Sequence, residues 1–87
     1  MASYEINWKR SAAKDLRKLP KETIPRIVDA VTALADNPFP PGVRKLVGAE
    51  STYRIREGVY RIIYTVMTEA LMVEVLRVGH RKDVDRE

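Results

Sequence analysis

Residues 53–62 read Tyr-Arg-Ile-Arg-Glu-Gly-Val-Tyr-Arg-Ile, and this stretch predicts a β-hairpin. Apolar and charged side chains alternate in both halves, which is the period of two expected of strands with one buried face. Glu57 and Gly58 separate the halves and provide a two-residue turn. The sequence therefore predicts two antiparallel strands, over residues 52–56 and 59–67.

Three arginines of this hairpin share one predicted face. With the two-residue turn, Arg56 pairs with Val59. Arg54 then pairs with Arg61, and the period of two places all three guanidinium groups on the same side. A bulged turn at Gly58 would shift the pairing by one, so the register is a hypothesis. The opposite face carries side chains that are predicted to point into the core, namely Tyr53, Ile55, Tyr60 and Ile62.

The rest of the chain supplies one strand, two helices and a further strand. Alternation over residues 3–8 predicts a strand, and apolar residues at helical spacing predict helices over 9–19 and 21–36. Residues 37–51 begin with a proline-rich segment and form a loop. Residues 71–78 predict the last strand. The order β-α-α-β-β-β indicates an α+β fold, with a two-helix hairpin packed on a mostly antiparallel four-stranded sheet.

The last predicted strand is apolar on both faces. A strand of this kind is usually covered on both sides, and the helix hairpin can cover only one of them. The second side therefore needs a further cover, which the short charged segment 79–87 cannot supply. One side is formed by Leu71, Val73 and Val75, and the other by Met72, Leu76 and Val78.

Length and composition indicate one domain spanning residues 1–87. The chain is 45% apolar and 32% charged, which is typical of a soluble globular protein. No apolar run approaches the ~18 residues of a membrane span and no export signal is evident, so a cytoplasmic location is expected. Cysteine is absent and histidine occurs once, so we expect no disulfide and no metal or other cofactor. The net charge of +4 is a weak indication of nucleic-acid binding.

Three guanidinium groups on one patch of sheet indicate a binding surface for a polyanionic ligand, because their mutual repulsion does not favour folding. Like charges directly opposite each other destabilise a sheet by about 0.2–1 kcal/mol per pair. Arginine binds phosphate through a bidentate fork and keeps its proton. Arg44 and Lys45 either extend this basic surface or belong to a solvated loop. The alternative interpretation of the whole patch is a solvated face that is screened by Glu57 and Glu69.

The residues after the last strand add an imidazole and a further guanidinium. His80 can exchange protons near neutral pH, and Arg81 can stabilise negative charge that develops on a phosphate. Both follow the strand directly, so its end can lie beside the arginine face. The alternative for a lone histidine in a charged tail is simple solvation.

These motifs together resemble the RelE/ParE superfamily of bacterial and archaeal toxins, and RelE in particular. The resemblance includes Ala-Lys-Asp-Leu-Arg-Lys-Leu at 13–19, Asn-Pro at 37–38, Lys-Leu-Val-Gly at 45–48 and Val-Gly-His-Arg-Lys-Asp-Val at 78–84, besides the hairpin. It implies a RelE-like fold and the toxin of a type II toxin–antitoxin system. Such a toxin is an mRNA interferase, a ribosome-dependent endoribonuclease that cuts mRNA in the ribosomal A site.

The resemblance also implies a mechanism and partners. The 2′-hydroxyl of the RNA attacks the neighbouring phosphate without a metal or other cofactor, and leaves a 2′,3′-cyclic phosphate and a 5′-hydroxyl. The partners implied are the ribosome with its mRNA and a RelB-type antitoxin, which binds the toxin in a hetero-oligomer. An antitoxin that wraps the toxin would cover the exposed apolar sheet surface.

The resemblance further assigns roles to individual residues. Arg61 and Arg81 would hold the scissile phosphate and its transition state. Arg54 and Arg56 would bind and orient the RNA, and the basic residues Arg44 and Lys45 are candidates to extend that contact. Arginine is a poor proton donor because its pKa exceeds about 12, so His80 is the candidate general acid or base.

One position departs from the family pattern. Many members have a tyrosine where this chain has Asp85, and an aspartate neither stacks on a base nor tolerates nearby phosphates. The substitution predicts an attenuated toxin, and the alternative is that Asp85 itself serves as a base. Two other function classes stay open: a ParE-type inhibitor of DNA gyrase, which shares the fold, and a non-catalytic member that binds the antitoxin.

Overall fold

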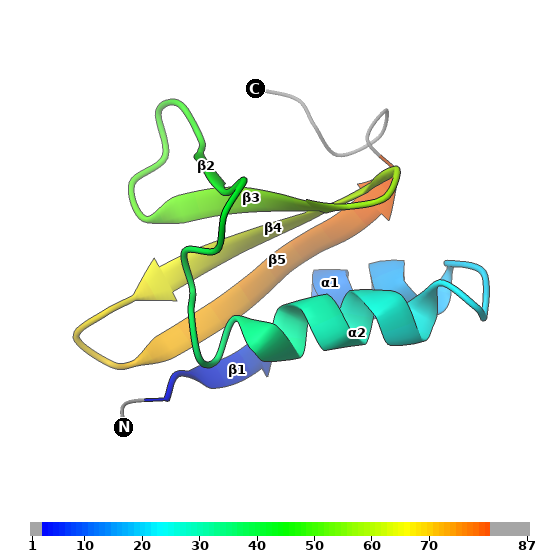
Figure 1. Ribbon diagram of the computed structural model, residues 1–87, viewed down its shortest axis with the longest axis horizontal. Helices are drawn as coiled ribbons and strands as arrows, with labels where there is room; N and C mark the ends of the chain where they lie inside the picture. The colour runs from blue at the N-terminus through cyan, green and yellow to red at the C-terminus, as the bar shows by residue number, and fades with distance from the viewer. Residues whose placement is uncertain (1–2, 81–87) are drawn as a thin grey trace.

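The computed structural model describes residues 3–80. Its elements, shown in Figure 1, follow in the order β1 (Glu5–Trp8), α1 (Arg10–Arg17), α2 (Ile24–Ala33), β2 (Arg44–Lys45), β3 (Thr52–Glu57), β4 (Tyr60–Met67) and β5 (Met72–His80). The predicted α+β fold is confirmed. The sheet has five strands and not the predicted four, because a short strand lies within the region predicted as a loop.

The five strands form one mixed sheet in the order β1-β5-β4-β3-β2. β1 runs parallel to β5, and the other neighbouring strands are antiparallel. The additional strand, β2, places Arg44 opposite Arg54 and Lys45 opposite Tyr53. A strand of two residues has no periodicity to detect, so only its pairing with β3 defines it.

Both helices pack on the same face of the sheet (Figure 1). α2 begins with Pro25 in its first turn, where the missing N–H costs no helical hydrogen bond. Neither helix of residues 3–80 is long and apolar enough to cross a membrane. The core between the helices and the sheet is formed by Ala12, Ile27, Val31, Leu34, Ile55, Ile62, Tyr64, Val66, Val73, Val75 and Val78.

A bulge interrupts the pairing of β4 with β5. Tyr64 pairs with Val75, but the next pair along is Ile63 with Arg77, so Leu76 is an extra residue. A bulge leaves one residue unpaired and reverses the in–out alternation of the strand beyond it. The alternation predicted for residues 71–78 therefore applies only up to Val75.

The bulge turns Val78 into the core. Val78 pairs with Ile62 and is 2% exposed, so it lies on the same side as Val73 and Val75. The prediction that Val78 lies on the opposite side from these two valines was wrong. The sheet face away from the helices is consequently less apolar than the sequence pattern indicated.

The segment after α2 is fixed to the sheet by Tyr64. Its hydroxyl donates a hydrogen bond to the carbonyl oxygen of Pro38 over 2.7 Å, and its ring stacks toward Tyr53, which contacts Phe39 edge to face. Burial, followed by the charge of neighbouring Tyr53, raises the pKa of the Tyr64 phenol. The phenol therefore stays protonated at neutral pH and keeps donating, which holds the chain that leads to β2.

Candidate nucleic-acid interface

The turn of the β3–β4 hairpin is formed by Gly58 and Val59. Glu57 pairs with Tyr60 across it, so Glu57 belongs to β3 and not to the turn. Gly58 has a φ of 63°, which glycine adopts without the strain that a side chain would cause. The turn was therefore predicted one residue too early.

The pairing of the arginines changes with the turn. Arg56 lies opposite Arg61, and Arg54 lies opposite Ile63. The predicted pairs of Arg56 with Val59 and of Arg54 with Arg61 were wrong, each by two residues on β4. A shift of two leaves every side chain on its predicted face, so the three arginines still share one side.

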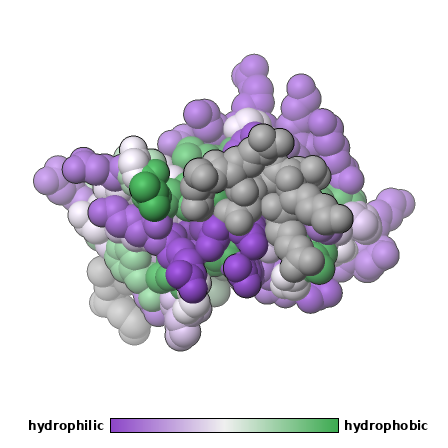
Figure 2. Space-filling model, turned by 90° about the horizontal axis from the view of Figure 1, so that it is seen from above, coloured by the Kyte–Doolittle hydropathy of each residue, from purple (hydrophilic) through white to green (hydrophobic). Residues whose placement is uncertain are grey.

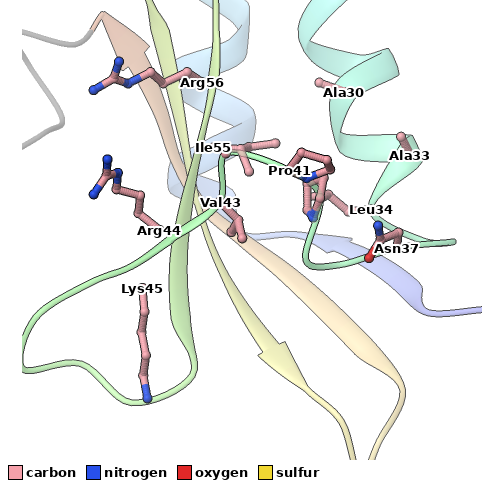
Figure 3. Close-up of a pocket in the computed structure, with 12 residues that line it drawn as sticks. Ala30, Ala33, Leu34, Asn37, Pro41, Val43, Arg44, Lys45, Ile55 and Arg56 are labelled. Atoms are coloured by element: carbon pink, nitrogen blue, oxygen red, sulfur yellow. The ribbon is translucent and has the colours of Figure 1, made fainter.

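Four arginines from three neighbouring strands gather on the sheet face away from the helices, which we call the open face. Arg44 lies opposite Arg54 and Arg56 lies opposite Arg61, and directly paired residues point to the same side. We call these four residues the arginine cluster. In Figure 3, Arg44 and Arg56 extend to the same side, away from α2, whereas Ile55 points toward that helix.

The arginine cluster opposes like charges twice. Each directly opposed pair costs about 0.2–1 kcal/mol in a sheet. Arg54 and Arg61 are each only 8% exposed, although arginine is usually solvated. In the view from above, hydrophilic side chains lie near the centre of the visible surface (Figure 2). This density of fixed positive charge is what a surface for phosphate groups requires.

The two acids proposed to screen the arginines lie elsewhere. Glu57 faces the helix side with Tyr60 and pairs with Arg26 of α2 over 3.2 Å. Glu69 belongs to the turn between β4 and β5, at the end of the sheet opposite to the hairpin turn. Among residues 3–80, the open face carries Glu5 on β1 and Glu74 on β5, and Glu74 accepts a hydrogen bond from Asn7. The interpretation as a screened face is therefore not supported by the positions of Glu57 and Glu69.

A groove of about 890 Å³ borders the cluster (Figure 3). It runs between the second half of α2, the proline-rich segment and the edge of the sheet, and Leu34, Val43 and Ile55 give it an apolar floor. Arg44, Lys45 and Arg56 also line it. Lys45 pairs with Tyr53, so its side chain belongs to the opposite side of the sheet from the arginine cluster. The contact of Lys45 with RNA stays a prediction.

The end of β5 does lie beside the cluster, but the histidine side chain points elsewhere. Gly79 is opposite Arg61, and His80 is opposite Tyr60, whose ring it meets edge to face at 6.1 Å between centroids. The imidazole therefore shares the side of Tyr60, which packs against the core, and its catalytic role stays a prediction. Arg81 and Asp85 lie outside the described residues.

Gly79 is a position of this surface that no pattern in the sequence singled out. It faces Arg61 only because of the bulge, and the sequence hides the reversed alternation because Leu76 and Val78 are both apolar. No three His, Asp or Glu side chains within residues 3–80 are arranged to hold a metal ion.

Most of the chain matches one family of known proteins. Residues 6–84 match the family described as the ParE toxin of the type II toxin–antitoxin system parDE. The chain belongs to the RelE/ParE superfamily of toxins. Toxin RelG of Mycobacterium tuberculosis is 34% identical to it, over 95% of this chain and 97% of the relative. Putative toxin RelE1 of Methanocaldococcus jannaschii is 23% identical, over 91% of each chain.

Solved structures of RelE toxins share this architecture. The toxin–antitoxin complex RelBE2 from Mycobacterium tuberculosis contains a chain with a TM-score of 0.81 and 31% identity, and the match covers 95% of this chain and 97% of that one. The archaeal RelE–RelB complex from Pyrococcus horikoshii gives a TM-score of 0.81 at 29% identity, over 94% and 99% of the two chains. The predicted RelE-like fold is thereby confirmed.

Proposed function

We propose that this member of the RelE/ParE superfamily is a ribosome-dependent endoribonuclease that cuts mRNA in the ribosomal A site. The observation that carries the proposal is the arginine cluster, which places four guanidinium groups on one sheet face and sets two pairs of them directly opposite each other. Inhibition of a protein target such as gyrase does not require fixed phosphate-binding groups. Membership of a superfamily that includes RelE toxins supports the same function.

In the proposed reaction the protein supplies charge and position. The 2′-oxygen of one nucleotide attacks the adjacent phosphorus, the bond to the 5′-oxygen of the next nucleotide breaks, and a 2′,3′-cyclic phosphate and a 5′-hydroxyl remain. The guanidinium of Arg61 binds the non-bridging oxygens and stabilises the additional negative charge of the transition state. Arg54, Arg56 and Arg44 bind the neighbouring phosphates and orient the strand.

Two residues outside the described part complete the proposal. Arg81 is proposed to hold the scissile phosphate together with Arg61. His80 is proposed to transfer protons from the 2′-hydroxyl and to the leaving oxygen, which requires its imidazole to turn from the side of Tyr60 toward the arginine cluster. Asp85 is proposed to attenuate the reaction because it replaces the tyrosine of related toxins. Replacing Asp85 by tyrosine is the direct check on attenuation, since growth inhibition should then increase.

The shape of the open face explains a need for the ribosome. The arginine cluster lies on an open sheet surface, and the groove beside it has an apolar floor with basic side chains only along its lining. Charge alone attracts RNA but does not align the 2′-oxygen with the bond that breaks, and alignment supplies much of the rate in such reactions. We infer that the ribosomal A site presents the mRNA in the reactive geometry.

The test is primer extension on mRNA in a purified translation system. We expect cuts within A-site codons in the presence of ribosomes, and none when the same mRNA is offered without them. An mRNA with a single 2′-deoxynucleotide at the attacking position should resist cutting there, because the nucleophile is missing. Cutting of free mRNA, or of the deoxy-substituted site, would contradict the proposal.

A ParE-type activity is the second candidate, because the matching family is described by ParE. The same preparation is therefore assayed for inhibition of DNA supercoiling by gyrase. No mRNA cuts together with blocked supercoiling would replace the nuclease by a gyrase inhibitor. Antitoxin binding without either activity would indicate the non-catalytic member.

A RelB-type antitoxin is the proposed partner, and the cytoplasm, where ribosomes translate, is the proposed location. Related RelE chains are solved in complexes with RelB. We assign the groove to an acidic, amphipathic segment of the antitoxin, because the floor is apolar and the lining charges are basic.

Co-expressed antitoxin should relieve growth arrest by the wild-type toxin and by Thr32→Glu, which changes an exposed α2 residue outside the groove. Ala33→Glu, which puts a negative charge into the groove, should escape that relief, and equal relief of both variants would remove the groove from the interface.

A further inference from the structure

β5 loses its strand partner on one side halfway along its length. β1 pairs with β5 only from Met72 to Val75, and the N–H of Lys9 then makes one more hydrogen bond, to the carbonyl of Val75 over 2.9 Å. Beyond that point no strand of the described chain lies next to residues 76–80 on this side. Backbone groups along such an edge need other partners or water.

Two side chains of α1 take the place of the missing strand. The hydroxyl of Ser11 donates to the carbonyl oxygen of Leu76 over 2.8 Å. The carboxylate of Asp15 accepts hydrogen bonds through one oxygen, from the backbone N–H of Val78 at 3.0 Å and from Nε of Arg77 at 2.8 Å. We call the contacts of Ser11 and Asp15 with the β5 backbone the β5 clasp.

The geometry of the helix favours this arrangement. Ser11 and Asp15 are four residues apart, so they lie on the same face of α1 and reach two alternate residues of the strand. The Asp15 side chain is 16% exposed, whereas that of Arg77 is 53% exposed. The partly buried carboxylate accepts from the strand backbone, and the more exposed Arg77 side chain contacts the same oxygen.

The β5 clasp spans the bulge, and the bulge decides which residue stands opposite Arg61. With the bulge, that residue is Gly79. Without it, the pairing of Tyr64 with Val75 would continue in step, and Val78 would come opposite Arg61. An isopropyl group would then stand beside the guanidinium on the open face.

We propose that Ser11 and Asp15 are positioning residues, which hold the bulge in β5 and so keep the side-chain-free Gly79 opposite Arg61. Gly79 places no side chain beside the Arg61 guanidinium, whereas Val78 would place an isopropyl group there. This inference rests on the proposed function for the identity of the ligand. Neither residue touches RNA in this arrangement, and both act through the backbone of β5.

The test compares Asp15→Ala with Asp15→Asn and, as a control on the same helix, with the exposed Lys14→Ala. Asp15→Ala should speed amide hydrogen exchange at Val78 by about tenfold or more, since a charge-assisted hydrogen bond is lost. It should also weaken the NMR contact between the Tyr60 and His80 rings and lower A-site cutting by a similar factor. Slow exchange at Val31 in the core confirms that the variant is folded.

The conservative variant Asp15→Asn separates the effect of the hydrogen-bond acceptor from the effect of the negative charge. In Asp15→Asn the amide oxygen still accepts from Val78, so exchange, ring contact and cutting should stay within about threefold of the wild type. Arg77→Gln should behave in the same way, because it leaves the acceptor of the β5 clasp intact. Lys14→Ala should match the wild type throughout.

The outcomes distinguish this inference from the proposed function. Unchanged exchange at Val78 in Asp15→Ala would show that the β5 clasp does not hold the strand. Faster exchange with wild-type cutting would show that it does not position the site. A wild-type protein that never cuts mRNA would overturn the proposed function, while the exchange and ring-contact measurements would still decide whether Asp15 sets the end of β5.

Discussion

Replacing Arg61 by alanine is expected to lower A-site cutting of mRNA by about 100-fold or more. Loss of one donor that stabilises transition-state charge typically costs a factor of 10²–10³. Arg61 is the member of the arginine cluster on β4, the middle strand of the sheet, where it lies opposite both Arg56 and Gly79. Arg61→Lys keeps the charge and loses the bidentate fork, so it should recover only part of the rate. The measurement is the fraction of mRNA cut per unit time in the purified translation system.

Arg17 provides the matched control for Arg61. It is an exposed arginine on α1, so Arg17→Ala removes the same charge from the helix side of the sheet and leaves the open face unchanged. We expect it to cut at the wild-type rate. Arg56→Ala should lower A-site cutting to an intermediate extent, mainly by raising the toxin concentration that is needed for half-maximal cutting. If Arg61→Ala cut as fast as Arg17→Ala, the cluster would have no part in the chemistry.

Replacing Ile62 by alanine is expected to lower the free energy of unfolding by about 2–5 kcal/mol. Ile62 has no exposed surface and lies between Ile55 and Val78 in the centre of the core. Domains gain about 0.05–0.15 kcal/mol per residue, so the cost is a large share of the stability of a chain this short. Urea unfolding followed by circular dichroism measures the loss.

The neighbouring isoleucine tests the assignment of the two faces. Ile63 is the same residue type one position later, but it points to the open face and stands outside the core cluster. It is 7% exposed, and water can fill the space that its truncation leaves at the surface, so Ile63→Ala should cost less than half as much as Ile62→Ala. Equal losses for the two variants would contradict the placement of the core on one side of β4.

Face assignments along the hairpin could be read from the sequence, whereas strand pairing could not. Tyr53 and Ile55 were correctly placed on the core side because alternation is a local property of a strand. The partners of Arg54 and Arg56 depended on which residues formed the turn, and a turn one residue later moved both by two. The arginine face survived this error because an even shift preserves the side.

Features that depend on a distant segment left no signal in the sequence. The two residues of β2 become a strand only through β3, and this pairing adds Arg44 to the open face. The bulge at Leu76 depends on β4 and on two side chains of α1. Periodicity within residues 71–78 therefore does not reveal the contacts of this strand with β4 and α1.

By itself, the sequence determined the order of the two helices and of four of the five strands, the common face of three arginines and the resemblance to RelE/ParE toxins, because these follow from local periodicity and residue identity. Only the tertiary structure decided that Lys45 and His80 point away from the arginine cluster and that Gly79 stands opposite Arg61. The physical reason is that a bulge changes the sheet face to which the following side chains point, and a turn sets which residues of two strands pair. At the bulge in β5, the backbone on either side makes hydrogen bonds to residues more than sixty positions away in the chain.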